Sequence, residues 1–571
     1  MSSNHTFFLT TAIDYTNGAP HIGHAYEKVL ADVIARYHRL KGDDVFFLTG
    51  VDQHGQKVQQ SAEKQGVAPQ AFVDEITAKF RALWQKLAVD YDGWAATTDE
   101  LHKDCVRAIL QRLWDDQGDD GQSKWLYKKS EGGHYSVRQE QFLTDKERGA
   151  DGEFGPEWQP VEYREEENFY FRLLPHKQWL LDLIDARRKT DKPLVIPDFR
   201  NDELRNAVEK LEGDLCISRP VARLQWGIPF PESFGAGFVT YVWFDALVNY
   251  LSFAPGFIEY FNAKSPRHQE EASEPELNNR KSPPQFQDYW PALHVIGKDI
   301  LIPAHGVYWP IMLRALGFED DNIPQFLVHG WWNISGAKMS KSLGNVIDPD
   351  VLADTYGVEA LRYYLMSDIA TGKDADFSEE RLIEIYNSDL ANKLGNLLNR
   401  TLSMAAKYRT SILKCPANDL IYGDPAASYE GPFRSRIGMF VATYKAGFEG
   451  DANTPDEMNP WLALTSVVEA TVHCNRFIEV KAPWKLAKDD TKQSELDAVL
   501  YTLAESLRII AILLSPVLPK AAHGIFDQLN WKLDAQGKES RFQLADATWG
   551  GLPDGHVLGQ PTPLFPRLET R

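Results

Sequence analysis

The sequence has few cysteines, and no two of them form a closely spaced pair. Cysteine occurs four times in 571 residues, at Cys105, Cys216, Cys415 and Cys474, with no Cys-x-x-Cys motif. Closely spaced cysteines are typical of structural zinc sites and of disulfide-stabilised secreted scaffolds. We therefore expect reduced thiols, no bound zinc and a cytoplasmic location.

Long apolar runs and an N-terminal targeting segment are also lacking. A membrane-spanning helix needs about 20 consecutive apolar residues, and no stretch of the sequence approaches this length. The N-terminus, MSSNHTFFLTTAID, has no basic region ahead of the strand-like run that begins at Thr6. We therefore expect neither a cleaved signal nor membrane attachment.

Positive charge is in deficit, because the formal net charge is −20. A protein that coats nucleic acid without specificity needs an excess of Lys and Arg, so this class is disfavoured. A local basic groove stays compatible with the composition, since attraction follows the local field rather than the total charge. Repeats of about 20 to 50 residues, which mark solenoid proteins, are not evident.

The first 50 residues have the pattern of a β-α-β unit. Residues 6–13, TFFLTTAI, are β-branched and aromatic, and from Val29 apolar residues recur at helical spacing. Residues 43–50, DDVFFLTG, form a second strand-like run. We expect a parallel pair of strands, with a ligand at their carboxyl ends.

The loop before the helix, NGAPHIGHAY, carries His21 and His24 beside Gly18 and Gly23. A helix N-terminus presents unpaired amide donors and a partial positive charge, so this loop is suited to hold phosphate, with the imidazoles as further donors. A tight turn with two surface histidines is the alternative.

The rest of the chain divides into α/β and helical parts. Alternating, Gly-rich residues near 118–160 predict strands and hairpins inserted into the first domain, and the polar stretch near 263–288 predicts a surface insertion. Beyond Glu379 the pattern is almost wholly helical, which predicts a helical bundle. The predicted segments are 1–116, 117–232, 233–325, 326–385 and 386–571.

A second motif, GAKMSKSLGN, places Lys338 and Lys341 three residues apart between Gly336 and Gly344. Taken alone, such a loop is most often a solvated lysine turn. Its combination with PHIGHAY, some 300 residues earlier, resembles the two signature motifs of class I aminoacyl-tRNA synthetases.

The resemblance extends to one family of that class. The segments TNGAPHIGHAY, FFLTGVDQHG, GDLCISRP, WGIPFP, YVWFDALVNY, VIGKDIL and KMSKSLGNVIDP are similar to methionyl-tRNA synthetases in order and spacing. The similarity runs from about Thr6 to Pro566, apart from the polar insertion. It implies a Rossmann-like parallel sheet with an inserted connective domain, followed by an anticodon-binding helical bundle.

The resemblance also implies a two-step reaction with ATP, Mg²⁺, L-methionine and tRNA(Met). Methionine is first activated to methionyl-adenylate, and the methionyl group then passes to the 3′ end of the tRNA. Phosphoryl-type transfer depends mostly on positioning and on neutralising charge.

The resemblance assigns residues to this reaction. The implied catalytic residues are His21, His24, Lys338 and Lys341. The implied ATP-binding residues are Gly23, Glu27, Gly297, Asp299, Lys338, Met339, Ser340 and Lys341. For Glu27, a first-turn carboxylate favoured by the helix dipole is the alternative.

The methionine site implied by the resemblance combines one carboxylate for the ammonium with an apolar pocket for the thioether. Its residues are Ile13, Tyr15, Asp52, Trp243, Ala246, Leu247, Tyr250, Ile300 and His305. Without the resemblance, Trp243 and Tyr250 would be ordinary core residues. Two departures affect this site: Asp14 places an unexpected carboxylate near the pocket, and one extra residue between Ile300 and Trp309 puts the role of His305 in doubt.

Two further regions follow the family pattern with differences. In the inserted domain, GGHYSVRQEQFLTD has Ser136 and Gln139 where the family usually has cysteines, so the resemblance implies a zinc-free member.

In the bundle, Asn396 and Arg400 lie one helical turn apart, and Trp484 could stack on an unpaired base. A surface polar pair and a packed tryptophan are the alternatives. No C-terminal tRNA-binding module follows, so we expect a monomer.

Two rival functions stay open at this point. One is a catalytically silent paralogue that binds tRNA or protein, which the intact motif residues disfavour. The other is a synthetase for another apolar amino acid, which is disfavoured by YVWFDALVNY and by the lack of a large editing domain.

Overall fold

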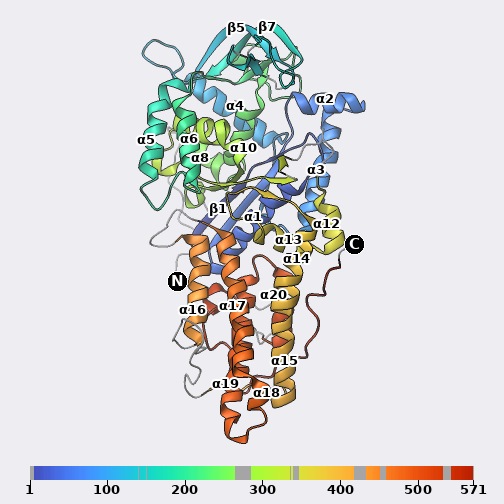
Figure 1. Ribbon diagram of the computed structural model, residues 1–571. Coiled ribbons are helices and arrows are strands. Elements are labelled where there is room, and N and C mark those ends of the chain that lie inside the picture. Colours follow the sequence, from blue (N-terminus) through green and yellow to red (C-terminus); the bar gives the residue numbers. More distant parts are fainter. Residues whose placement is uncertain are drawn as a thin grey trace.

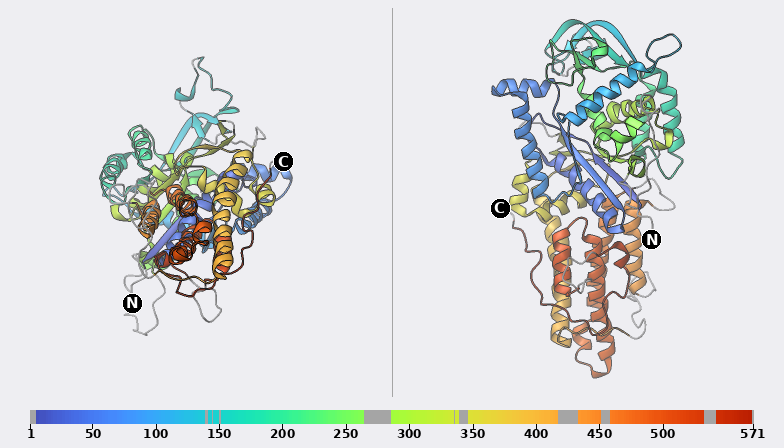
Figure 2. Two further views of the ribbon diagram at one scale, coloured as in Figure 1. Left: turned by 60° about the horizontal axis from the view of Figure 1, so that its bottom comes forward. Right: turned by 180° about the vertical axis from the view of Figure 1, so that it is seen from behind.

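The structure is a computed structural model, and it describes residues 5–138, 141–143, 145–149, 151–263, 285–334, 336–338, 346–416, 433–450, 458–531 and 542–569. The described parts form three tiers (Figure 1). A small antiparallel sheet lies at one end, a parallel sheet with its helices lies in the middle, and a bundle of long helices forms the other end. The view from behind shows the same order (Figure 2).

The middle tier is built on a seven-stranded parallel sheet. The strand order is β2-β3-β1-β12-β13-β8, and β4 pairs with β3. The strands are β1 (Thr6–Thr11), β2 (Asp14–Tyr15), β3 (Asp44–Asp52), β4 (Gly93–Ala96), β8 (Val195–Ile196), β12 (Leu293–Gly297) and β13 (Gln325–His329). Because β1 and β3 pair in parallel around α1 (Ile22–Lys41), the predicted β-α-β unit is confirmed.

Successive residues of the central strands enter two different cores. Leu9 and Phe47 pack with α1 on one face of the sheet, whereas Phe8 and Leu48 pack with α4 and α7 on the other. This is the doubly covered arrangement expected for strands buried on both sides. The helices of this tier are α1, α2 (Gln56–Gln65), α3 (Pro69–Lys86), α4 (Glu100–Asp115), α5 (Lys177–Arg187), α6 (Phe199–Glu209), α7 (Val242–Ser252), α8 (Phe257–Ala263), α9 (Phe286–Tyr289), α10 (Lys298–Ile300), the π-type segment η4 (Leu301–Tyr308) and α11 (Trp309–Ala315).

The inserted region forms a separate antiparallel sheet with the order β6-β5-β7-β9. Its strands are β5 (Leu126–Ser136), β6 (Gln141–Leu143), β7 (Val161–Phe171) and β9 (Leu215–Cys216), and β10 (Ser218–Pro220) pairs with β11 (Phe238–Thr240). Strands and hairpins were the prediction here. Strand β8, which lies within the predicted segment 117–232, pairs instead with β13 of the parallel sheet.

Beyond β13 a small sheet leads into the helical tier. Its order is β15-β14-β16, with β14 (Trp332–Ile334), β15 (Ala337–Lys338) and β16 (Ala375–Asp376). The helices are α12 (Pro349–Tyr356), α13 (Val358–Ser367), α14 (Glu379–Ile385), the π-type segment η7 (Tyr386–Gly395), α15 (Asn396–Arg409), α16 (Phe433–Glu449), α17 (Pro460–Lys481), α18 (Pro483–Leu486), α19 (Gln493–Leu514) and α20 (Pro519–Leu529). The predicted helical bundle is confirmed. No helix in the described ranges is both long enough and apolar enough to span a bilayer.

The helical tier shares a core with the sheet. The Tyr37 ring of α1 stacks on Phe448 of α16 with centroids 4.1 Å apart. Arg362 of α13 is fully buried and donates to the Asp32 carboxylate of α1 at 2.7 Å. It also donates to the carbonyl oxygens of Leu87, Pro516 and Val517. One guanidinium therefore joins α1, the end of α3 and the segment after α19.

Candidate functional site

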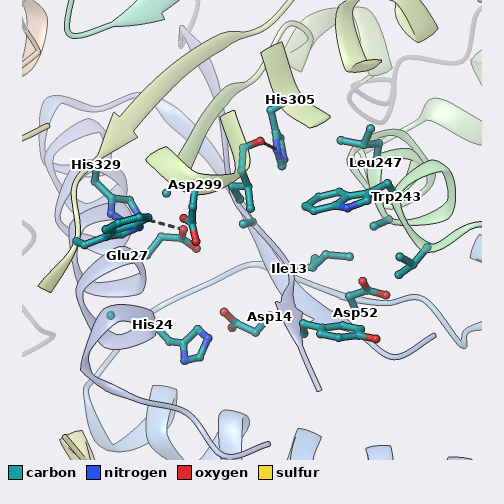
Figure 3. Close-up of a pocket in the computed structure, with 18 of the residues that line it drawn as sticks. Ile13, Asp14, His24, Glu27, Asp52, Trp243, Leu247, Asp299, His305 and His329 are labelled. Atoms are coloured by element: carbon teal, nitrogen blue, oxygen red, sulfur yellow. Dashed lines mark hydrogen bonds and ion pairs between the residues drawn. The ribbon is translucent and has the colours of Figure 1, made fainter. Parts of the chain in front are cut away.

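The site is a cavity of about 450 Å³ at the carboxyl ends of β1, β3, β12 and β13. It has the size of a small-molecule site and lies at the strand ends, as parallel sheets predict. Figure 3 shows its lining side chains. The cavity brings together these predicted residues: Ile13, Tyr15, His21, Gly23, His24, Glu27, Asp52, Trp243, Ala246, Leu247, Tyr250, Gly297, Asp299, Ile300 and His305.

The loop at the start of α1 is fixed by its own histidines. The His21 Nδ1 accepts from the Gly23 amide at 3.1 Å, and the His24 Nδ1 accepts from the His21 amide at 3.1 Å. The rings stack with centroids 3.8 Å apart. A neutral imidazole whose Nδ1 accepts carries its hydrogen on Nε2. In their neutral form both rings therefore carry the hydrogen on Nε2, and they lie at a helix end that already favours anions.

A buried chain of charged groups lines the next part of the cavity. The Lys28 Nζ donates to Glu27 Oε1 at 2.7 Å and to Asp14 Oδ1 at 2.9 Å. The other Glu27 oxygen lies 3.0 Å from the His329 Nε2. Burial alone would raise the pKa of Glu27, but the Lys28 ammonium and the His329 contact hold that pKa below its usual value. Glu27 is therefore a charged acceptor, and each oxygen keeps further acceptor capacity.

The apolar end of the cavity contains one buried polar pair. The Tyr250 hydroxyl lies 2.8 Å from the His305 Nε2, and the His305 Nδ1 lies 2.9 Å from the Ile300 carbonyl oxygen. Burial lowers the pKa of His305 to about 4. The ring is therefore neutral, with its hydrogen on Nδ1 and its Nε2 accepting from Tyr250. The Trp243 ring meets His305 edge-on.

The segment between Ile300 and Trp309, where the resemblance implied an added residue, forms the π-type helix η4, with a non-helical kink at Ile302. His305 lies in this segment and lines the cavity (Figure 3).

Asp52 is a third buried carboxylate of the cavity, after Glu27 and Asp14, and it lies at the end of β3. Burial raises the pKa of Asp52 well above its usual value, and the charge of Asp245 acts in the same direction. Asp245 is itself held between His54, at 2.8 Å, and His102, at 3.0 Å. These contacts connect α7, which carries the apolar pocket, to the Asp52 loop and to α4.

Several lining residues were not predicted: Ala12, Lys57, Tyr241, Val242, His329, Gly330, Trp331 and Trp332. Four of them form the segment HGWW, which begins at His329, the last residue of β13, and ends at Trp332, the first residue of β14. The sequence held a signal for this segment. HGWW carries a histidine and a glycine at the end of a strand-like run, as do the loops with His21 and Asp52 that were predicted to bind a ligand.

The second motif is only partly described. The backbone of Lys338 belongs to β15, but its side chain lies outside the described part, as do Met339, Ser340 and Lys341. In the inserted sheet, Ser136 donates to the Trp158 carbonyl oxygen at 2.6 Å, and Gln139 lies outside the described residues. Among the described residues, no group of three or more His, Cys, Asp or Glu could hold a metal ion.

A second, more open groove lies in the helical bundle. It is lined by Asn392, Lys393, Asn396, Arg400, Val472, Asn475, Arg476 and Glu479. Two predicted residues, Asn396 and Arg400, are therefore on one wall, and the Arg400 guanidinium donates to Glu479 at 2.6 Å. The third, Trp484, is on α18 and is 37% exposed.

A Rossmann-like sheet with a histidine-capped helix at its strand ends, followed by a helical bundle, is the arrangement that the resemblance to class I aminoacyl-tRNA synthetases implied, and the family comparison shows this class. The family described as "tRNA synthetases class I (M)" matches residues 7–152 and 157–402. The "Anticodon binding domain of methionyl tRNA ligase" matches residues 451–571. The chain belongs to the methionyl-tRNA synthetase family.

Individual relatives cover almost the whole chain. A methionine–tRNA ligase of Deinococcus radiodurans is 39% identical over an alignment of 571 positions that covers 99% of this chain and 75% of that protein. One from Thermosynechococcus vestitus is 38% identical, over 98% of this chain and 97% of that protein. A solved structure of Mycobacterium tuberculosis methionyl-tRNA synthetase in complex with methionyl-adenylate has a TM-score of 0.80 and 33% identity, and covers 98% of this chain and 100% of that one.

Proposed function

We propose that this chain is an active methionine–tRNA ligase. It would activate L-methionine with ATP to methionyl-adenylate, release diphosphate, and transfer the methionyl group to the 3′ end of tRNA(Met), which releases AMP. One observation carries the proposal. The helix end that is suited to bind phosphate, at His21 and His24, and the apolar pocket that is suited to a thioether line the same cavity. The family membership, and the methionyl-adenylate bound by the Mycobacterium tuberculosis relative, support the same function.

In the first step, the methionine carboxylate attacks the ATP α-phosphate. The Nε2 hydrogens of His21 and His24 would donate to phosphate oxygens as negative charge grows, from a helix end that adds its own partial charge. Glu27 and Asp299 would accept from the ribose hydroxyls. Gly23 would let adenine approach the backbone, since it has no side chain. A Cβ at this position would also crowd the His21 ring, at 3.0 Å. Gly297 would flank the ribose.

For methionine, Asp52 would bind the α-ammonium in its charged form. The thioether would lie against the Tyr250–His305 pair and the edge of Trp243, where sulfur contacts aromatic rings favourably. Ile13, Ala246, Leu247 and Ile300 would supply the apolar walls, and Tyr15 the rim.

The remaining assignments belong to the same proposal. Lys338 and Lys341, with Met339 and Ser340, would close over the triphosphate from a glycine-flanked loop. Mg²⁺ would enter with the ATP phosphates, which supply hard oxygen ligands. Asn396, Arg400 and Trp484 would contact the anticodon. We also infer a monomer in the cytoplasm, without zinc, and the domain divisions at residues 116, 232, 325 and 385 remain predictions.

The test is amino-acid-dependent ATP–pyrophosphate exchange with the purified protein, across all twenty amino acids and without tRNA. We expect exchange with methionine alone. Exchange driven by another amino acid would contradict the pocket assignment. Absence of exchange with all of them, in the presence of tRNA as well, would favour the binding-only paralogue.

A further inference from the structure

Asp14 is an unusual part of the cavity wall, because it is a buried carboxyl with only one oxygen satisfied. It is 5% exposed and lies on β2, between His24 and Asp52 in the close-up (Figure 3). Its Oδ1 accepts from the Lys28 ammonium at 2.9 Å. Its Oδ2 is buried and finds no hydrogen-bond partner among the described residues. A buried polar atom without a partner is costly, so a ligand or a proton is the expected complement.

Lys28 cannot fully neutralise Asp14, because its ammonium is shared. The Lys28 Nζ donates to Asp14 Oδ1, to Glu27 Oε1 at 2.7 Å and to the Ala12 carbonyl oxygen at 3.0 Å. An ammonium has three donors, so none remains for Asp14 Oδ2. Glu27 makes the shorter contact and also faces His329. One cation therefore serves two carboxylates inside the protein.

The groups around Asp14 determine its charge. From α1 it faces Lys28 and Glu27, with His24 at the start of the same helix. From β3 the carboxylate of Asp52 lies along the same wall, and Trp84 of α3 contributes an uncharged ring beneath Lys28. Burial raises the pKa of Asp14 to about 7; the Lys28 charge lowers it and the Glu27 charge raises it. A polyanion that enters this cavity disfavours the charged carboxylate further.

We propose that Asp14 takes up a proton from solvent when ATP binds, and that its Oδ2 hydroxyl then donates a hydrogen bond to an anionic oxygen of the substrates. A protonated carboxyl is a donor, whereas a carboxylate accepts only. Asp14 would thus change from a group that repels the triphosphate to one that binds it. The inference rests on the proposed function, since it takes ATP as the ligand.

The test compares the KM for ATP between pH 6 and pH 9, at saturating methionine, for the parent chain, Asp14→Asn and Asp74→Asn. Asparagine is uncharged and donates through its amide, so it imitates protonated Asp14. Asp74 is an exposed aspartate on α3 whose carboxylate accepts from Gln70, which makes it the matched control. Titration of ATP itself affects all three proteins equally.

We expect the parent KM for ATP to rise above pH 7 by as much as about tenfold per pH unit, the limit for one required proton. Asp14→Asn should show a flatter profile and a lower KM than the parent at pH 8.5, and Asp74→Asn should follow the parent. Parallel profiles for Asp14→Asn and the parent would overturn the proposal. A raised KM for methionine at every pH, with the ATP profile unchanged, would overturn it in favour of a fixed anionic acceptor.

A second measurement needs only the parent. Calorimetric titration with a non-hydrolysable ATP analogue at pH 8, in two buffers of different ionisation enthalpy, gives the number of protons bound. Uptake of close to one proton supports the inference, and zero uptake overturns it even if Asp14→Asn does not fold. Methionine-dependent exchange by the parent tests the proposed function separately, so a failure of either idea can be distinguished from a failure of both.

Discussion

Arg362→Met should destabilise the protein by several kcal/mol, although Arg362 lies outside the proposed active site. The guanidinium has no exposed surface and makes one ion pair with Asp32 and three hydrogen bonds to backbone carbonyls. Breaking a buried ion pair from one side costs about 3 to 5 kcal/mol. Asp32 would keep the Arg36 guanidinium at 2.8 Å. We therefore expect about 3 kcal/mol, the lower end of that range.

The assay is urea unfolding followed by circular dichroism and tryptophan fluorescence, with the free energy taken from the first transition. Arg36→Met is the matched control, because Arg36 binds the same carboxylate but is partly exposed. Partly exposed pairs contribute about 0 to 1 kcal/mol, so Arg36→Met should stay in that range. If Arg362→Met also falls within about 1 kcal/mol of the parent, Arg362 does not join the two tiers as described.

Three further results are expected. Tyr250→Phe removes the donor to the buried His305 Nε2, which should lower the free energy of unfolding by about 1 to 3 kcal/mol. Because His305 is then no longer held at the pocket wall, the KM for methionine in pyrophosphate exchange should rise with a smaller change in kcat, and an unchanged KM would contradict the pocket assignment. The KM for methionine should rise on acidification. Burial raises the pKa of Asp52, so the charged carboxylate that binds the ammonium is lost as the pH falls through that pKa. A methionine KM that stays constant from pH 5 to pH 8 would argue against Asp52 as the ammonium partner. Trp484→Ala should raise the KM for tRNA and leave pyrophosphate exchange intact, whereas equal damage to both would indicate a packing role for this ring.

The fold was predictable where a local pattern carries the information. The β-α-β unit and the bundle follow from periodicities of two and of about 3.6 residues, which need no knowledge of distant segments. Pairing of β8 with β13 has no such signal, since two residues, Val195 and Ile196, are too few to show a period. The run ALHVIGKDI, residues 292–300, shows the limit of such patterns: it has strand character throughout, but Lys298–Ile300 forms a helical turn.

Sequence motifs predicted many residues of the candidate site, but no physical pattern in the sequence predicted the contacts between its buried charges. The predicted residues that line the cavity were identified mostly by resemblance, and the structure places them in one cavity. The partners of buried charges were not identified, because nothing local connects Asp14 to Lys28, Glu27 to His329 or Asp32 to Arg362. Such pairs form across 14 residues in the first case and more than 300 in the other two. Each is determined by which helix and strand meet in space.

The reciprocal capping of His21 and His24 has a consequence for the chemistry of the cavity. In each ring a backbone amide occupies Nδ1, so the hydrogen on Nε2 is present without a second proton. The two proposed phosphate donors can thus work as neutral dipoles. Alkaline conditions, which would discharge a pair of imidazolium ions, leave such donors in place, and the backbone keeps both of them oriented before any nucleotide arrives.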